Sequence, residues 1–144
     1  MGSTYANGPT PTIATFGGGY SPASPAPLEM VLRQQVAPAL FTTTGTVAIT
    51  VAELATRILS YTGAGGTLTT PTAAQLDAYC PNAQQNDSFD FTVIATSGTA
   101  TIGLGTGVTA VGALTTAAST ATMFRLRKTN APGATSAWVI YRVG

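Results

Sequence analysis

The chain has 144 residues, of which only 8% are charged and none is histidine, and its formal net charge is +1 at pH 7. Six Lys and Arg against five Asp and Glu cannot form the dense basic face that nucleic-acid binding needs, so we expect no nucleic-acid partner. The lack of histidine removes the usual proton carrier near neutral pH and a common metal ligand, which excludes most hydrolase and zinc mechanisms. The low charge instead favours a surface that partners cover.

Residues 1–27 contain five prolines, three consecutive glycines and no charged side chain. This composition predicts an extended arm, which cannot bury enough apolar area to fold alone. We expect its apolar side chains to anchor it on a partner. The predicted anchors are Tyr5, Ile13, Phe16 and Tyr20 along the arm, with Leu28, Met30 and Phe41 fastening its base. The alternative is that these side chains fold back and fill the core of their own body.

Apolar spacing over residues 28–36 predicts a short helix that ends before Pro38. We therefore assign residues 1–40 to the arm and residues 41–144 to a β-rich body. The arm begins without the basic and apolar regions of a signal peptide, and no apolar run approaches the roughly 20 residues that a membrane helix needs. We expect a soluble protein without a membrane partner.

The first helix of the body is predicted from a capping pattern. Thr50 and Glu53 follow a strand predicted over residues 46–50, and their spacing is that of a capping box, in which each side chain binds the other residue's backbone N–H. The apolar spacing that follows predicts a helix over residues 51–61, with Gly63 as its C-terminal cap.

A second helix is predicted over residues 71–80. Thr70 is the expected N-cap, and Pro71 takes the first helical position, where its missing N–H costs nothing. Pro81 follows the end of this helix. Cys80 is the single cysteine, so no internal disulfide can form, and we expect it to be a small buried side chain.

After residue 82 the apolar period changes from 3.6 to 2, which predicts strands. The predicted strands cover residues 89–94, 100–104, 107–111, 120–128 and 138–143. Short strands separated by Gly, Ser, Asn and Pro predict a mainly β fold with two or three short helices, an antiparallel β-sandwich or barrel-like body preceded by the extended N-terminal arm.

The last two predicted strands are expected to form a hairpin. Their matching alternation gives one shared face to Phe124, Leu126, Val139 and Tyr141. Trp138 and Ile140 then face a second layer. Acidic side chains precede the hairpin and basic ones lie on it, so cross-strand or cross-subunit ion pairs are expected among Asp77, Asp87, Asp90, Arg125, Arg127, Lys128 and Arg142.

Motifs that suggest chemistry have simpler interpretations. Asp87 and Asp90 suit a turn and the strand after it rather than an acid and base pair. Residues 103–108, GLGTGV, lack the later glycine and the GK[ST] ending of nucleotide loops, and residues 86–88, NDS, suit a turn. We therefore expect no catalytic, cofactor-binding or metal site, and a protein that is not an enzyme.

Four segments carry a resemblance to a known family: ELATRILSYTG, TLTTPTAAQLDAYCPNAQQNDSFDFTVIATSG, TIGLGTGVTAVG and FRLRKTNAPGATSAWVIYRVG. Together they cover roughly the last 90 residues. In this order they resemble short structural proteins of tailed phages, particularly those of cyanobacteria and marine bacteria. The resemblance implies a head decoration or cement protein, which sits on the capsid as a trimer. Some related domains occur in tails or fibres.

Two functions follow from these observations. The first is a virion protein on the capsid surface, a homotrimeric cement whose arm binds the major capsid protein or neighbouring copies of itself. The second is a receptor- or glycan-binding module of a tail or fibre, with Trp138 and the tyrosines exposed. A cement protein should hide its aromatic side chains in subunit contacts, whereas a binding module should expose them.

Overall fold

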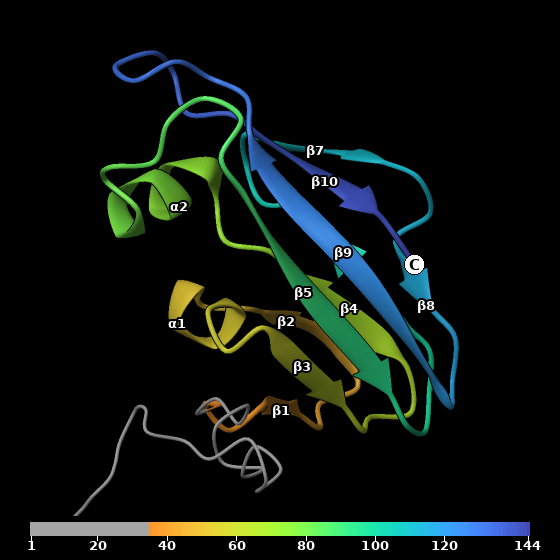
Figure 1. The fold of residues 1–144 in the computed structure, drawn as a ribbon. Helices are drawn as coiled ribbons and strands as arrows, with labels where there is room; N and C mark the ends of the chain where they lie inside the picture. The colour runs from red at the N-terminus through yellow and green to blue at the C-terminus, as the bar shows by residue number, and fades with distance from the viewer. Residues whose placement is uncertain (1–34) are drawn as a thin grey trace, which may run out of the picture. The chain divides into compact units, whose positions relative to one another are not determined.

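The computed structural model describes residues 35–144 (Figure 1). Most of the predicted arm, most of the helix predicted near residues 28–36, and six of the seven predicted anchors fall on residues 1–34, outside the described residues. Val36–Gly144 form one compact unit. This body already includes a strand at 39–41, so it starts slightly before residue 41, where the sequence places its boundary.

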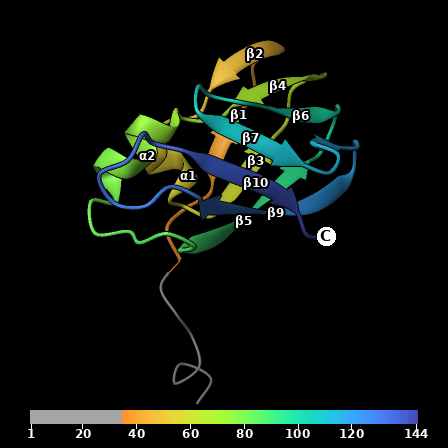
Figure 2. The ribbon, with the colours of Figure 1, turned by 90° about the horizontal axis from the view of Figure 1, so that it is seen from above.

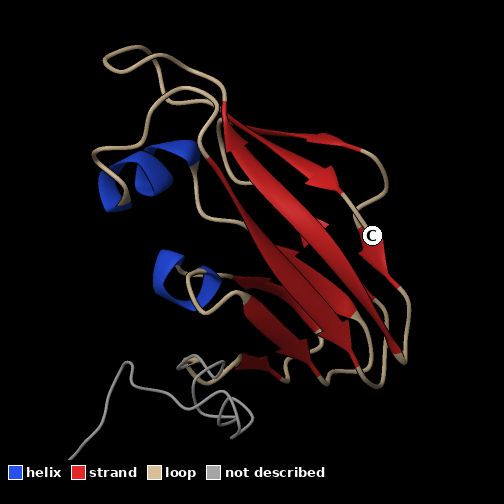
Figure 3. Ribbon diagram, in the orientation of Figure 1, coloured by secondary structure: helices blue, strands red, loops and turns tan. Residues whose placement is uncertain are grey.

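The body contains two β-sheets and two short helices, which confirms the mainly β fold (Figure 3). The first sheet has six strands in the spatial order β1 (Ala39–Phe41), β3 (Ile58–Tyr61), β5 (Ser88–Ala95), β9 (Thr120–Lys128), β10 (Trp138–Arg142) and β7 (Val108–Val111). The second has four, in the order β2 (Gly45–Ala48), β4 (Gly66–Thr69), β6 (Ala100–Gly103) and β8 (Thr115–Thr116). The helices are α1 (Val51–Leu54) and α2 (Ala73–Tyr79). Figure 2 shows the sheets as two layers.

Strand direction differs from the antiparallel arrangement predicted from the sequence. Among the described residues, five of the eight neighbouring strand pairs are parallel. The reason is that the chain alternates between the two sheets, so β1, β3 and β5 run in one direction, as do β2, β4 and β6. Parallel neighbours need crossover connections, which pass through α1 or α2 in the coils and through β8 and β9 for the fifth parallel pair, β7 and β10.

The first six strands therefore form three stacked coils, each with one strand in either sheet. Equivalent positions of successive coils lie side by side, as in the column of Val47, Leu68 and Ile102. Close approach between coils requires glycine at Gly66, because a Cβ there would collide with the carbonyl oxygen of Gly45. The three coils thus repeat one structural unit, as in solenoid proteins.

The helix predicted over residues 51–61 is wrong beyond its first turn. The predicted capping box of Thr50 and Glu53 is present, but α1 ends at Leu54 and Arg57 adopts a positive φ of 69°. Residues 58–61 then form β3, in which Leu59 and Tyr61 are fully buried at a period of two. Pairing with β5 outweighs the helical spacing, because it buries these two side chains. Gly63 is not a helix cap but packs against the Tyr61 ring.

Helix α2 lies within the predicted range 71–80 but starts two residues later than expected. Its N-cap is Thr72, which forms a capping box with Gln75. The expected cap, Thr70, is buried, and its hydroxyl accepts a hydrogen bond from the backbone N–H of Gly105 at 2.9 Å. Thr70 thus connects two turns of the stacked coils instead of beginning the helix.

The predicted hairpin of β9 and β10 is confirmed, but the prediction of which residues share its core face is wrong. Leu126 pairs with Ile140, so Phe124 and Leu126 share the core face with Trp138 and Ile140 rather than with Val139 and Tyr141. The connecting loop sets this register. Its Asn130 side chain donates to the carbonyls of Ala131 and Ala134 and accepts from the N–H of Ala137.

The core fills the space between the sheets and beneath the helices. Its largest fully buried side chains include Tyr61, Phe91 and Phe124, and the last two stack with ring centroids 5.7 Å apart. Leu54 of α1 and Leu76 of α2 close the core at the helical end. No helix within residues 35–144 combines the length and apolar character needed to cross a membrane.

Candidate functional site

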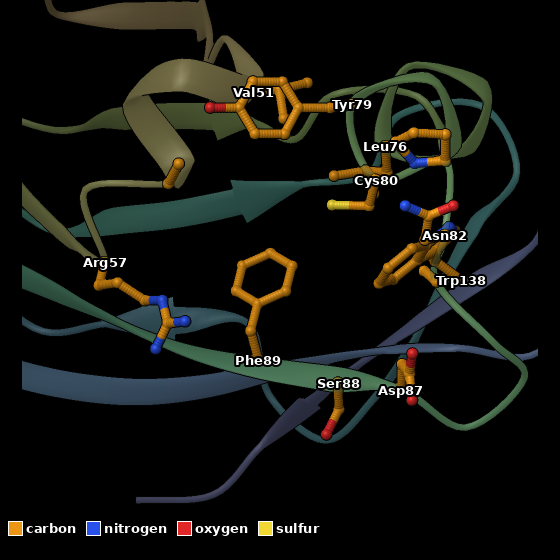
Figure 4. Close-up of a pocket in the computed structure, with 13 residues that line it drawn as sticks. Val51, Arg57, Leu76, Tyr79, Cys80, Asn82, Asp87, Ser88, Phe89 and Trp138 are labelled. Carbon is orange, nitrogen blue, oxygen red and sulfur yellow. The ribbon is translucent and has the colours of Figure 1, made fainter.

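A pocket of about 560 Å³ lies where the two helices meet the start of β5 (Figure 4). Its walls are mainly apolar, with polar side chains at the rim. The lining residues include Val51, Leu76, Tyr79, Cys80, Phe89 and Trp138, with Arg57, Asn82, Asp87 and Ser88. This volume and composition are typical of sites that take a small molecule or a partner's side chain.

Phe89 stands in the middle of this pocket (Figure 4). Its ring meets that of Trp138 edge-on, with centroids 6.3 Å apart, and the guanidinium of Arg57 lies 5.9 Å from the Phe89 centroid. Arg57 occupies a left-handed backbone conformation, which costs energy for a residue other than glycine. The turn that ends α1 therefore presents a cation to an aromatic wall.

The opposite rim is built by the turn before β5. The Asp87 carboxylate accepts a hydrogen bond from the N–H of Gln84 at 2.8 Å, and Asn86 adopts a positive φ of 77°. This turn also bonds to β9 through Lys128, whose N–H donates to the Asp87 carbonyl and whose carbonyl accepts from Asn86. The rim is thus fixed by the main sheet and presents carboxylate and hydroxyl groups from Asp87 and Ser88.

Cys80, which the sequence predicts to be buried, is half-buried and lines this pocket. Tyr79 beside it is 55% exposed. Within residues 35–144, no group of three His, Cys, Asp or Glu side chains could hold a metal ion. The lining of this pocket offers apolar contact in its interior and hydrogen bonding at its rim.

Asp77 lies behind the pocket in a cluster that joins α2 to the hairpin. One carboxylate oxygen accepts from Lys128 Nζ at 2.6 Å and from Trp138 Nε1 at 2.8 Å. Partial burial raises the pKa of Asp77, but hydrogen bonds from Lys128, Ser136 and Trp138 and the charge of Lys128 outweigh it and lower that pKa from 3.8 to about 2. Lys128 is only 4% exposed, so this pair is a structural link.

Asp90 and Arg125 form the second ion pair, directly opposite one another on β5 and β9. Two hydrogen bonds of 2.6 and 2.9 Å join the guanidinium to the carboxylate and lower the pKa of Asp90. The predicted pairing between acidic residues and the basic hairpin is confirmed for Asp77 and Asp90. The sequence did not indicate which partners they would take.

The six-stranded sheet has an outer face with no strand or helix of the described chain in front of it (Figure 1). We call it the open face. Two neighbouring rows of this face are largely apolar, and their large apolar residues are Leu40, Ile58, Ile94, Met123 and Val143. Leu40 is 63% exposed, Met123 44% and Val143 45%. Adjacent exposed apolar side chains mark a surface suited to a partner.

Among the seven predicted anchors, only Phe41 is described. It lies in β1, is 5% exposed and belongs to the core, so for this residue the alternative of packing onto its own body holds. Trp138, which a binding module should expose, is 2% exposed, and Tyr61 is fully buried. The sequence missed the pocket because its walls come from residues between 51 and 138 that only the fold brings together.

Comparison with known proteins assigns no family, since no family model, no curated protein and no solved structure matches this chain.

Proposed function

We propose that this chain is a structural protein of a virus particle, a cement or decoration protein on the capsid of a phage head. It acts as a homotrimer, and its N-terminal arm contacts the major capsid protein and neighbouring copies of itself. The observation that carries this proposal is the open face, where exposed Leu40, Met123 and Val143 lie beside half-buried Ile58 and Ile94. A chain with a net charge of +1 has little electrostatic repulsion to keep its copies apart.

The composition supports the same proposal. Only 8% of residues are charged, which suits a surface covered by neighbours in a shell better than one that must hold a lone molecule in solution. Many copies on a symmetric shell turn weak contacts into strong attachment. The stacked coils provide a rigid body for such contacts.

The test starts with the mass of the full-length protein by sedimentation, followed by mixing with phage particles that lack it. A trimer that binds the shell and raises its resistance to heat is expected. Substituting Met123→Glu should weaken attachment, because it places a charge on the open face. Leu104→Glu is the matched control, since Leu104 is 42% exposed but lies outside the rows of that face.

Deleting residues 1–27 should lower the occupancy of the protein on particles without changing the far-ultraviolet circular dichroism of its body. Unchanged occupancy after this deletion would contradict the role of the arm. Equal attachment of the Met123→Glu and Leu104→Glu variants would contradict the role of the open face.

A second candidate is a receptor- or glycan-binding module of a tail or fibre. The pocket favours it, because Phe89 and the exposed Tyr79 offer ring faces beside polar rim groups. In this case the protein binds host cells, and Tyr79→Ala reduces that binding while leaving attachment to particles unchanged. A protein that binds the shell but not host cells would exclude this second function.

A further inference from the structure

The stack of coils has an open end. β1 is the outermost strand of the six-stranded sheet and β2 the outermost strand of the four-stranded sheet, and both belong to the first coil. Within residues 35–144 neither strand pairs on its outer side, whereas β3, β4, β5 and β6 each have two neighbours. Solenoid proteins usually cover such an end with a capping unit, because it exposes unpaired backbone groups.

The backbone groups that this end presents follow from the alternation of each strand. The Phe41 carbonyl accepts from the N–H of Thr62 at 2.8 Å, so Phe41 bonds to β3, and the N–H and C=O groups of Leu40 and Thr42 point away from it. At β2, the N–H groups of Gly45 and of Ile49, just after the strand, donate to the carbonyls of Gly65 and Thr69 at 3.2 and 2.8 Å, so by the same alternation the groups of Thr46 and Ala48 point outward. Both sheets therefore offer donors and acceptors at the same end of the stack.

This edge lacks the charged side chains and prolines that commonly keep edge strands from pairing with other molecules. Residues 39–48 contain no charged residue and no proline. Edge strands of proteins that stay apart commonly carry lysine, proline or a bulge for that purpose. Leu40 on β1 is 63% exposed beside the edge. An edge without charge on a chain of near-zero net charge favours pairing with another copy of the chain.

The repetition of the coils indicates which sequence would continue them. Three columns of side-by-side residues cross β1, β3 and β5 in this order. The column on the open face is Leu40, Ser60 and Ile94, and the next, toward the core, is Phe41, Tyr61 and Ala95. The third column is Thr42, Thr62 and Thr96. Residues 13–17 read IATFG, and residues 94–98 of the third coil read IATSG. Tyr20 follows Ala14 by six residues, as Val47 follows Phe41. Residues 13–17 of the arm thus match the end of β5 and the turn after it at four of five positions.

We propose that the open edge of β1 is a strand-addition site that binds residues 12–16 of a neighbouring copy as a parallel strand. In the register of the coils, Ile13 lies beside Leu40 and covers it, and the small Ala14 lies beside Phe41. The Ala14 N–H then donates to the Leu40 carbonyl, as Phe41 and β3 pair in the existing stack. This inference rests on the proposed function, in which arms join neighbouring copies, and it names the segment and the edge that receives it.

The first test is a cross-link between two different molecules. Cys80→Ser removes the native thiol, and Ile13→Cys and Leu40→Cys are then made in separate full-length chains. The two proteins are mixed and treated with a short bismaleimide. A covalent dimer that contains one chain of each kind is expected, and Ser3→Cys in place of Ile13→Cys is the control that should give little of it.

Absence of the mixed dimer over the whole concentration range in which the protein stays in solution would overturn the proposal. So would a chain carrying both cysteines that links only within itself, since the segment would then serve its own molecule. Mass spectrometry of the cross-linked peptides distinguishes these results.

The second test removes one hydrogen-bond donor. Ala14→Pro in the full-length chain should weaken self-association by about tenfold or more in sedimentation, because proline lacks the N–H that pairs with Leu40. Ala23→Pro is the matched control and should leave self-association unchanged, since it lies outside the proposed strand. Equal effects of the two prolines would overturn the proposal, and equal melting temperatures would show that both bodies are folded.

These experiments need no phage particle, so they separate this inference from the proposed function. Cross-linking without attachment to particles would leave the strand exchange standing and remove the cement role. Attachment that depends on the arm, with no cross-link and no effect of Ala14→Pro, would leave the cement role standing and remove the strand exchange.

Discussion

The stacked coils and the C-terminal hairpin divide the charges of this chain unequally. β1, β2, β3, β4 and β6 contain no charged residue, whereas β9 and β10 contain four of the six Lys and Arg side chains. Most of these hairpin charges have partners within the chain, such as Asp77 for Lys128 and Asp90 for Arg125. The coils are held by apolar columns and backbone hydrogen bonds instead. The hairpin is thus fixed by its own side chains, while the coils leave an uncharged edge for partners.

The largest effect should come from breaking the hairpin's buried ion pair. Asp77→Ala should lower the free energy of unfolding by about 2–4 kcal/mol, because it leaves the Lys128 ammonium, 4% exposed, and the Trp138 N–H without their acceptor, while Asp77 itself is only partly buried. Denaturation by urea measures this loss. Asp87→Ala is the control, since Asp87 is exposed and its carboxylate accepts a turn hydrogen bond from the N–H of Gln84. A loss no larger than that of the control would contradict the structural role of Asp77.

The same carboxylate should make the hairpin sensitive to acid. Because the pKa of Asp77 is lowered from 3.8 to about 2, the folded state binds fewer protons than the unfolded state between these values. Its contribution, about 2 kcal/mol, is fully present above about pH 4 and is lost as the pH falls through 2. Unfolding of wild type and Asp77→Asn should differ most at neutral pH and converge toward pH 2. A constant difference across this range would contradict the assignment.

The sequence predicted the positions of most strands better than it predicted the directions in which they run. Two-residue periodicity located β5, β9 and β10, and the Thr50 and Glu53 pattern located α1. The same apolar spacing misassigned residues 58–61, since a single turn of helix followed by a short strand reproduces helical spacing by coincidence. Strand direction was not accessible either, because alternation within a strand is identical in parallel and antiparallel sheets.

One signal in the sequence would have shown the coils. Thr50 and Glu53 in the first coil have a counterpart in Thr72 and Gln75 of the second, and each pair stands shortly after a residue of the Val47, Leu68 and Ile102 column. Two similar caps at similar distances from a strand indicate a repeated unit. The pocket could not be found in this way, because its aromatic walls, Phe89 and Trp138, lie 49 residues apart in sequence and meet only across the sheet.

A smaller loss of stability should distinguish the coils from the hairpin when one tyrosine in each is replaced by phenylalanine. The Tyr61 hydroxyl donates to the Thr43 carbonyl at 3.1 Å and accepts from the Gly65 N–H at 3.2 Å, which fixes the turn between β3 and β4. Tyr61→Phe should lower stability by about 1–2 kcal/mol, because both backbone groups lose a partner next to a fully buried ring. Tyr141→Phe is the matched hairpin variant.

Tyr141→Phe should cost less than Tyr61→Phe. Its hydroxyl accepts only from the Arg127 guanidinium, and both side chains are half-exposed, so water replaces the lost bond. Thermal unfolding of the two variants measures the difference. Equal losses, or a larger loss at Tyr141, would mean that side-chain hydrogen bonds support the hairpin as much as they support the coil turns.

The smallest effect should come from the exposed pair on the open face. Arg125→Gln should change the melting temperature less than Tyr61→Phe does, because exposed ion pairs contribute little to stability and salt screens them. Its clearest consequence is on Asp90, whose lowered pKa is due mainly to the hydrogen bond from Arg125 and should return toward 3.8 in the variant. Carboxyl chemical shifts followed by nuclear magnetic resonance during an acid titration measure that pKa. An unchanged Asp90 pKa would mean that another cation holds this carboxylate ionised, such as Arg57, whose charge also lowers the Asp90 pKa.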